Sequence, residues 1–369
     1  MDLKRTGALI GLAALTTVGL AACSDDNTGS GDTAAQTVAD AECGGKESLN
    51  SSGSSAQNNA MTVFANSFAT SCEGQTIDYN SNGSGAGVKE FIGGQTDFGG
   101  SDSALKENEY APAQERCESE AWNLPAVFGP IAVAYNLDGV DLKLSGSTIA
   151  KIFNGQITTW NDPAIAAENE GAELPDQPIT VIFRSDESGT TDNFQKYLDA
   201  ASDGAWTQEA GKTFNGGVGE GAKGNEGVSA AIGQTPGTVT YTEWSYAKNQ
   251  NLAMVNVITP ADTAGVELNA ETAGKTIDSA KLKNEGSNDL VIDTSSFYVP
   301  EAAGAYPILM PTYEIVCSKY PDPETAAAVK AFLNVAVSEE VQGELEGEGY
   351  IPVPDAFRAK LTTAISEIS

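Results

Sequence analysis

The sequence predicts an α/β protein of about two domains, built on a doubly wound, mostly parallel sheet. The first observation is alternation: runs typical of strands, such as residues 131–135 and 179–183, alternate with stretches typical of helices, such as residues 60–70 and 324–337. The second is length, since 369 residues exceed one domain of roughly 150 residues. The third is composition: 40% hydrophobic and 19% charged residues indicate packed cores rather than disorder.

The expected elements follow one another in short runs. Strands are expected where β-branched and aromatic residues cluster, at residues 76–79, 131–135, 179–183 and 238–241. Helix-like stretches lie between or beyond them, at residues 60–70, 88–92, 147–153, 191–198 and 324–337. No internal repeat or heptad is present, so neither a solenoid nor a coiled coil is expected.

The N-terminus has the pattern of an export signal. Lys4 and Arg5 precede a mostly apolar run at residues 7–20, which is too short to span a bilayer comfortably and fits a signal peptide. Small residues follow at Ala21 and Ala22, which suits cleavage by a signal peptidase. We therefore expect residues 1–22 to be removed and the mature chain to be extracytoplasmic.

A lipid anchor is expected at Cys23. The run Leu20-Ala21-Ala22-Cys23 is similar to the lipobox of bacterial lipoproteins, in which the cysteine becomes the first mature residue and carries diacylglycerol. Two acyl chains give durable attachment to the cell membrane. Residues 23–45 contain many Asp, Thr, Ala and Gly residues without a hydrophobic period, which predicts a flexible tether. The alternative is an ordinary cleaved signal with a coincidental cysteine.

The cysteine count predicts disulfides. Beyond Cys23 the sequence has Cys43, Cys72, Cys117 and Cys317, an even number in an exported chain. Two disulfides are expected, with three possible pairings left open; one disulfide with free thiols is the alternative. No C-x-x-C spacing occurs, so neither a thiol redox motif nor a zinc ribbon is supported.

Charge and histidine content exclude several function classes. The chain has no histidine, which removes Ser-His-Asp and Cys-His catalysis and His-ligated zinc sites. The formal net charge of -31 argues against a nucleic-acid partner, because phosphate backbones are bound by clustered Lys and Arg. At first sight it also argues against any anionic ligand.

Three junctions between strands and helices point the other way. Glycine and small polar residues gather at residues 50–55, 82–87 and 186–190. In open α/β sheets ligands bind beyond the carboxyl ends of strands, and free N–H groups with the helix dipole favour an anion there. Ordinary helix capping explains any one junction alone. Together the three predict an anion site.

Two charged residues accompany these junctions. Arg184 follows the strand at 179–183, and a guanidinium suits an oxyanion because it forms two parallel hydrogen bonds; an ion pair with Asp186 is the alternative use and is compatible with binding. Asp102 follows a strand, where it can accept the proton of a protonated oxyanion and disfavour one without a proton. The alternative for Asp102 is a helix N-cap.

Catalytic motifs are incomplete. Gly83-Ser84-Gly85-Ala86-Gly87-Val88-Lys89 fits neither a Walker A loop nor a dinucleotide fingerprint. The pair Ser103 and Lys106 has the S-x-x-K spacing of penicillin-recognising enzymes without their companion motifs. Ser188 lies in an incomplete nucleophile elbow and has no histidine base. A binding protein is therefore expected, and an exported phosphatase or Ser-Lys hydrolase is the rival from another class.

Taken together, these motifs resemble the phosphate-binding proteins of bacterial phosphate ABC importers, the PstS family. The resemblance covers residues 46–368 and rests on residues 83–89, 96–102, 152–162, 184–190, 224–228 and 236–241. It implies a two-lobed periplasmic-binding-protein fold (a type II Venus flytrap) with two hinge crossings. The implied lobes are residues 46–127 plus 307–369, and residues 128–306.

The resemblance also implies a binding site for inorganic phosphate, without a cofactor or metal. Ser84 supplies its N–H and hydroxyl, Asp102 accepts the phosphate proton, and Arg184, oriented by Asp186, makes charged hydrogen bonds. N–H and hydroxyl donors are implied at Ser188, Gly189 and Thr190. The closed protein, expected to be a monomer, would dock on transmembrane permease subunits. A binder of another tetrahedral oxyanion and a phosphate sensor without a transport role are the alternatives.

One loop departs from the family pattern. The family's first loop usually reads Gly-Ala-Thr-Phe followed by Pro, whereas this chain has Gly53-Ser54-Ser55-Ala56-Gln57. Ser55 can replace the threonine hydroxyl and Ala56 can still donate its N–H. We therefore expect both residues to contact the ligand.

Overall fold

The structure is a computed structural model that describes residues 35–39 and 41–369. The predicted signal peptide and Cys23 lie outside the described residues, as does most of the predicted tether. The end of that tether lies against the domain: the N–H of Gln36 donates to Ser67 Oγ (3.2 Å), and that of Val38 donates to Ser71 Oγ (2.9 Å).

The first half of the fold alternates strands and helices. It contains β1 (Ser48–Gly53), α1 (Asn58–Ser71), β2 (Thr76–Asn80), α2 (Ser84–Ile92), β3 (Phe98–Ser101) and α3 (Glu107–Cys117). β1 pairs in parallel with both β2 and β3. Three helices at the C-terminal end of the chain complete this half: α11 (Pro323–Ala336), α12 (Glu339–Glu344) and α13 (Asp355–Ser366).

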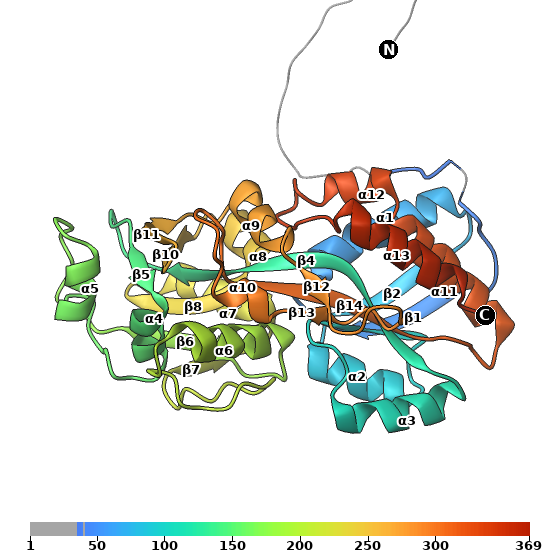
Figure 1. Cartoon of the computed structure of the whole chain (residues 1–369), viewed down its shortest axis with the longest axis horizontal. Coiled ribbons are helices and arrows are strands. Elements are labelled where there is room, and N and C mark those ends of the chain that lie inside the picture. Colours follow the sequence, from blue (N-terminus) through green and yellow to red (C-terminus); the bar gives the residue numbers. More distant parts are fainter. Residues whose placement is uncertain (1–34, 40) are drawn as a thin grey trace, which may run out of the picture. The chain divides into compact units, whose positions relative to one another are not determined.

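Two long strands join this half to the second one. They are β4 (Ala121–Tyr135) and β14 (Leu309–Cys317), which pair antiparallel with each other. β4 pairs with β14 up to Pro130 and with β8 (Thr238–Glu243) from Ile131 onward, so a single strand belongs to both halves (Figure 1).

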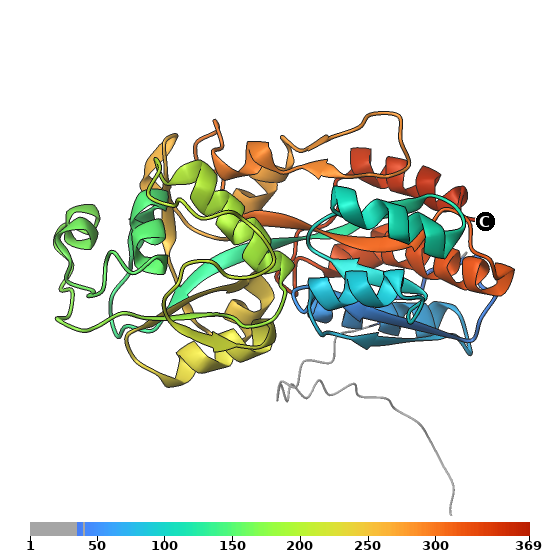
Figure 2. The ribbon, with the colours of Figure 1, turned by 90° about the horizontal axis from the view of Figure 1, so that it is seen from below.

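The second half begins after β4. Its first elements are β5 (Lys143–Ser145), α4 (Gly146–Phe153), α5 (Pro163–Glu168), β6 (Thr180–Arg184), α6 (Gly189–Ala201), β7 (Glu220–Ala222) and α7 (Gly224–Gln234). After β8 follow α8 (Trp244–Asn249), β9 (Ala253–Met254), β10 (Asn256–Thr259), β11 (Asp262–Val266), α9 (Ala270–Ile277), β12 (Lys281–Leu282), β13 (Ile292–Asp293) and α10 (Ser295–Tyr298). Figure 2 shows the two groups of elements from below.

The main sheet has the order β2-β1-β3-β14-β4-β8-β6-β7, and β9 also pairs with β4. The outer pairs β1–β2, β1–β3, β6–β7 and β6–β8 are parallel, whereas all pairs made by β4 or β14 are antiparallel. The prediction of a mostly parallel sheet is therefore wrong at its centre, because the connecting strands run against their neighbours. The two-lobed α/β fold is confirmed, and the lobe boundaries at 127/128 and 306/307 stay a prediction.

Apolar side chains fill the space between sheet and helices. In the first half Phe332 of α11 stacks on Phe98 of β3, with ring centroids 5.1 Å apart. In the second half Tyr241 of β8 stacks on Phe194 of α6 at 4.5 Å. Aromatic pairs of this kind add to the free energy gained by burying their area. Both packings fix a helix against the strands that lead to the predicted anion site.

Two disulfides are present, as predicted, in one of the three possible pairings. Cys43 bonds to Cys72 at the end of α1, and Cys117 at the end of α3 bonds to Cys317 at the end of β14. Both bonds lie in the first half of the fold.

Candidate functional site

The fold brings all three predicted junctions into direct contact. Gly83, which precedes α2, donates its N–H to the carbonyl of Gly53 at the end of β1 (2.7 Å). Gly85 in the first turn of α2 donates to the carbonyl of Glu187, just before α6 (2.9 Å). A Cβ on Gly83, whose φ is +104°, would lie 2.6 Å from Asp186 Oδ2, so this close approach depends on glycine.

Asp102 is buried directly after β3 and accepts hydrogen bonds from three hydroxyls. Oδ1 accepts from Ser54 Oγ (2.5 Å) and Thr312 Oγ1 (3.1 Å), and Oδ2 accepts from Ser84 Oγ (3.3 Å). Burial raises the pKa of Asp102, while these hydrogen bonds and the charge of Arg184 oppose the shift. α3 begins at Glu107, so Asp102 is not its N-cap.

Arg184, the last residue of β6, is buried in an ion pair with Asp186. Arg184 Nε donates to Asp186 Oδ1 (2.7 Å), Nη2 donates to Oδ2, and Nη1 lies 3.5 Å from Thr190 Oγ1. Burial alone would lower the pKa of Arg184, but Asp186 outweighs it and the pKa is raised. Burial likewise favours a higher pKa for Asp186, and Arg184 outweighs it and lowers the pKa. The guanidinium therefore stays charged in a buried position.

The start of α6 faces the same place. Ser188 caps the helix, because its Oγ accepts from the N–H of Thr191 (3.1 Å), and its own N–H donates to the carbonyl of Lys212 (2.8 Å). Helix geometry leaves the N–H groups of Gly189 and Thr190 without an intrahelical acceptor. Ser188 thus uses its N–H inside the protein, whereas the N–H groups of the next two residues have no acceptor within the helix.

The polar groups of the first loop make hydrogen bonds inside the protein, and the predicted ligand contacts of Ser55 and Ala56 stay a prediction. Ser55 Oγ accepts from Asn225 N (3.0 Å) and Asn225 Nδ2 (3.1 Å). Ala56 donates its N–H to Ser54 Oγ (3.0 Å). The structure therefore brings Ser54, and not Ser55 or Ala56, into contact with Asp102.

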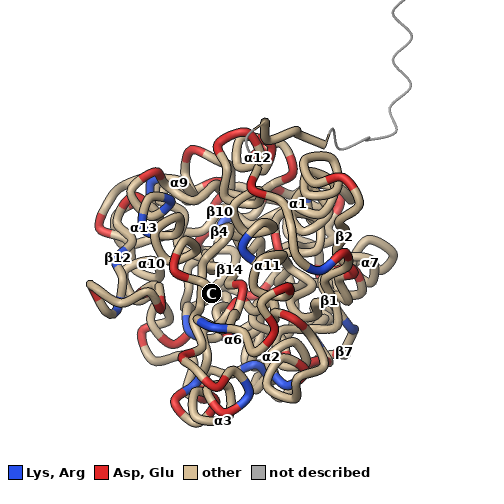
Figure 3. The backbone as a smooth tube through the Cα atoms, turned by 90° about the vertical axis from the view of Figure 1, so that its right-hand side faces the viewer, with Lys and Arg blue, Asp and Glu red and all other residues tan. Residues whose placement is uncertain are grey.

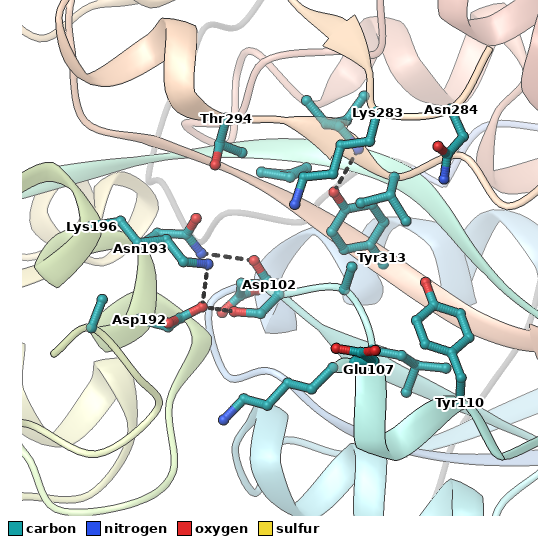
Figure 4. Close-up of a pocket in the computed structure, with 18 residues that line it drawn as sticks. Asp102, Glu107, Tyr110, Asp192, Asn193, Lys196, Lys283, Asn284, Thr294 and Tyr313 are labelled. Carbon is teal, nitrogen blue, oxygen red and sulfur yellow. Dashed lines mark hydrogen bonds and ion pairs between the residues drawn. The ribbon is translucent and has the colours of Figure 1, made fainter. Parts of the chain in front are cut away.

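A cavity of about 580 Å³ lies beside Asp102 (Figure 4). Of the predicted ligand-binding residues, only Asp102 lines it. In the described part of the chain no group of three or more His, Cys, Asp or Glu side chains is placed to hold a metal ion.

Comparison with known proteins connects this geometry to a family. The family model described as "PBP superfamily domain" matches residues 28–340. Phosphate-binding protein PstS 3 of Mycobacterium tuberculosis is 56% identical over 372 residues, covering 100% of both chains. Phosphate-binding protein PstS of Pasteurella multocida is 31% identical, covering 78% of this chain and 81% of its own. The chain belongs to the PstS family.

Solved structures show the same fold. A high-affinity periplasmic phosphate-binding protein (PfluDING) bound with phosphate has a TM-score of 0.72 at 22% identity, covering 86% of this chain and 93% of its own. A putative phosphate ABC transporter substrate-binding protein of Clostridium perfringens has a TM-score of 0.60 at 21% identity, covering 83% and 100%. These likenesses support the two-lobed PstS fold.

Three polar residues of this cluster were not predicted from the sequence. Ser54 stands where the family pattern given above has alanine, Thr312 lies on β14 far along the chain, and Asn225 lies in the Gly224–Val228 stretch that contributes to the resemblance. Only Asn225 carried a local signal, the Gly-Asn-Glu-Gly run at the start of α7. Asn225 bridges Ser55 and Thr190, since its Nδ2 lies 3.1 Å and 3.3 Å from their hydroxyls.

Proposed function

We propose that the chain binds one inorganic phosphate ion among Ser84, Asp102, Arg184, Gly189 and Thr190. The observation that carries the proposal is the burial of the charged Arg184 guanidinium. It lies near the carboxyl group of Asp102 and the free N–H groups at the start of α6. Charge-assisted hydrogen bonds from Arg184 and the N–H groups suit the phosphate oxygens. The names of the relatives agree with this ligand.

Asp102 supplies the selectivity. A carboxylate has about four acceptor positions, and three hydroxyls occupy two on Oδ1 and one on Oδ2. The remaining position on Oδ2 accepts the proton of a protonated phosphate. Sulfate has no proton to offer near neutral pH, so it leaves this acceptor unmatched and brings two negative charges together.

The other predicted residues differ in which hydrogen-bond donors they have left for phosphate. Ala56 and Ser188 already donate their N–H groups inside the protein, so those N–H groups contact phosphate only if the partner is exchanged on binding. The hydroxyls of Ser55 and Ser188 act as acceptors there and keep their own proton for a ligand. Asp186 acts through Arg184, because its two carboxylate oxygens hold the guanidinium in place.

We further propose that the chain is a non-enzymatic component of a phosphate ABC importer. It works outside the cell membrane, anchored by lipid on Cys23, and as a monomer passes phosphate to the transmembrane permease subunits. Phosphate holds the two lobes, residues 46–127 plus 307–369 and residues 128–306, together by contacting both. Among the described residues no helix is long and apolar enough to span a bilayer.

Titration calorimetry with phosphate and with sulfate tests the ligand. The expected result is one phosphate bound per chain with micromolar or tighter affinity and negligible heat from sulfate. Equal binding of both anions would contradict the role of Asp102 and favour a general oxyanion binder. Turnover of a phosphate monoester that is lost in Ser188→Ala would instead indicate an enzyme. Phosphate uptake in a deletion strain separates an importer component from a sensor.

A further inference from the structure

Asn225 contacts two hydroxyl groups of the candidate site at once. It is the second residue of α7 and is fully buried. One hydroxyl belongs to Ser55, which follows β1 in the first half of the fold, and the other to Thr190, in the first turn of α6 in the second half. A single amide group therefore reaches both sides of the proposed phosphate site.

The backbone of β8 fixes the orientation of the Asn225 amide. Asn225 Oδ1 accepts from the N–H of Glu243 (2.8 Å) and from Thr242 Oγ1 (3.1 Å). A backbone N–H can only donate, so the amide atom that faces it must be the oxygen. The NH₂ group consequently points to Ser55 and Thr190, and its two N–H bonds can serve one hydroxyl each.

Each of the two hydroxyl oxygens accepts from two donors. Ser55 Oγ accepts from the backbone N–H of Asn225 as well as from its Nδ2. Thr190 Oγ1 accepts from Asn225 Nδ2 and, over a longer distance of 3.5 Å, from Arg184 Nη1. A hydroxyl has two lone pairs and one proton. With both lone pairs occupied, each hydroxyl has only its proton left to offer, and neither donates it to another described residue of the protein.

The hydroxyls around Asp102 have the opposite polarity. Ser54 Oγ and Thr312 Oγ1 give their protons to Asp102 Oδ1. The candidate site thus has a carboxylate that accepts a proton on one side, and two hydroxyls that can only donate one on the other.

Donors of this kind matter because the charge of the chain opposes an anion. The formal net charge is -31, and Asp and Glu residues are spread widely over the elements in the view of Figure 3. Arg184, the cation of the proposed site, is already paired with Asp186. Neutral groups with their dipoles held in fixed directions therefore contribute to the attraction that net charge does not supply.

We propose that Asn225 is a positioning residue for phosphate, which directs the hydroxyl protons of Ser55 and Thr190 toward the ion. It acts through these two hydroxyls. The proposal rests on the proposed function and adds an orientation of the ion: unprotonated phosphate oxygens face Ser55 and Thr190, and the protonated oxygen faces Asp102.

Asn225→Asp tests the proposal because it changes the positions of hydrogen atoms and hardly changes the shape of the side chain. One oxygen of the introduced carboxylate can still accept from the N–H of Glu243. The other replaces the NH₂ group and takes the protons of Ser55 and Thr190 for itself. Calorimetry on the full chain should show phosphate binding weakened by about a hundredfold or more, because two hydrogen bonds to a charged ion are lost.

Asn169→Asp is the matched control. Asn169 is also a buried asparagine, and within the described residues its amide bonds only to the backbone of Lys143 and Ile165. The same loss of an amide donor should lower the free energy of unfolding, yet leave phosphate affinity within about twofold of the wild type, as expected for a site without shared partners.

A double-mutant cycle shows whether Asn225 acts through the two hydroxyls. The partner change is Ser55→Ala combined with Thr190→Val, which removes both hydroxyls. Asn225→Ala should cost about tenfold or more in phosphate affinity in the wild-type background and less than about twofold in the background without hydroxyls. A purely structural role of Asn225 would give the same loss in both backgrounds.

The outcomes separate this proposal from the proposed function. Wild-type affinity in Asn225→Asp would overturn the positioning role, as would equal losses in both backgrounds of the cycle. A wild-type chain that binds no phosphate would contradict the proposed function itself. If Asn225→Asp does not fold, the cycle with Asn225→Ala gives the decision.

Discussion

Gly189 lies directly against Asp102. A Cβ at position 189 would come within 2.6 Å of the Asp102 Cβ and 2.8 Å of its Oδ2. Asn193, one turn further along α6, holds the two segments together because its Nδ2 donates to the carbonyls of Asp102 (2.8 Å) and Gly189 (2.9 Å). The start of α6 therefore meets the end of β3 with no side chain between them.

Replacing Gly189 with alanine should weaken phosphate binding by about tenfold or more, since the methyl group pushes α6 away from Asp102 and more than one hydrogen bond to the ion is lengthened. Calorimetry gives the affinity. Gly274→Ala is the control, because Gly274 lies in α9, a Cβ at this position would have no neighbour within 4 Å, and alanine is the better helix former. Full affinity in Gly189→Ala would show that the two segments need not approach so closely.

Arg184→Ala should cost about 2–5 kcal/mol of phosphate binding free energy, the usual loss when one partner of a buried charge pair is removed. It should also lower the free energy of unfolding, because the partly buried carboxylate of Asp186 loses its ion-pair partner and keeps only the N–H of Gly224. Calorimetry and urea unfolding measure the two effects. Arg358→Ala, which breaks a pair with the exposed Asp355 in α13, should change neither quantity noticeably.

Asp102→Asn should weaken phosphate binding less than Arg184→Ala does, and should improve sulfate binding relative to phosphate. The amide keeps the shape of the side chain while removing its charge, so an ion without a proton meets less repulsion. The ratio of the two dissociation constants is the quantity to compare with the wild type. An unchanged ratio would mean that Asp102 only holds the loop hydroxyls in place.

Stability should fall as pH rises from about 4.5 to about 8, because burial raises the pKa of Glu314 from 4.5 to about 8. In that range Glu314 keeps its proton in the folded state and has released it in the unfolded chain. The free energy of unfolding therefore falls by about 1.4 kcal/mol per pH unit. Burial also raises the pKa of Asp102 and Glu243, with the same sign. Glu314→Gln should flatten the dependence in urea unfolding, whereas Glu340→Gln on the exposed surface should not. An equal slope in both variants would exclude Glu314 as the source.

Local patterns were enough to predict the start of α6 and its surroundings. Arg184, Asp186 and Ser188 are close in sequence, so one stretch of chain displays both the ion pair and the helix cap. Asp102 was predicted as a site residue because a carboxylate directly after a strand is visible in sequence. The helix α2 was predicted to begin at residue 88 and begins at Ser84, since Gly85 and Gly87 hide the helical pattern.

Contacts between distant segments were not predictable. Thr312 reaches Asp102 from β14, and nothing in its neighbourhood indicates a site. Only residues 131–135 of β4 were predicted as strand, and the remainder contains Pro125 and Pro130, a residue type that is uncommon within a central strand. The structure accommodates Pro125 at an irregularity in the pairing with β14. β4 and β14 form the antiparallel centre of the sheet. Since only part of β4 was predicted, this antiparallel pairing was not predicted either.

The disulfide between Cys117 and Cys317 has a consequence for handling the protein. The bond encloses the whole second half, because its two cysteines are 200 residues apart and flank both connecting strands. A protease that cuts once anywhere inside this enclosed stretch leaves one covalent molecule. Such a clipped sample would migrate as a single intact band on a non-reducing gel and divide into two fragments only after thiol treatment.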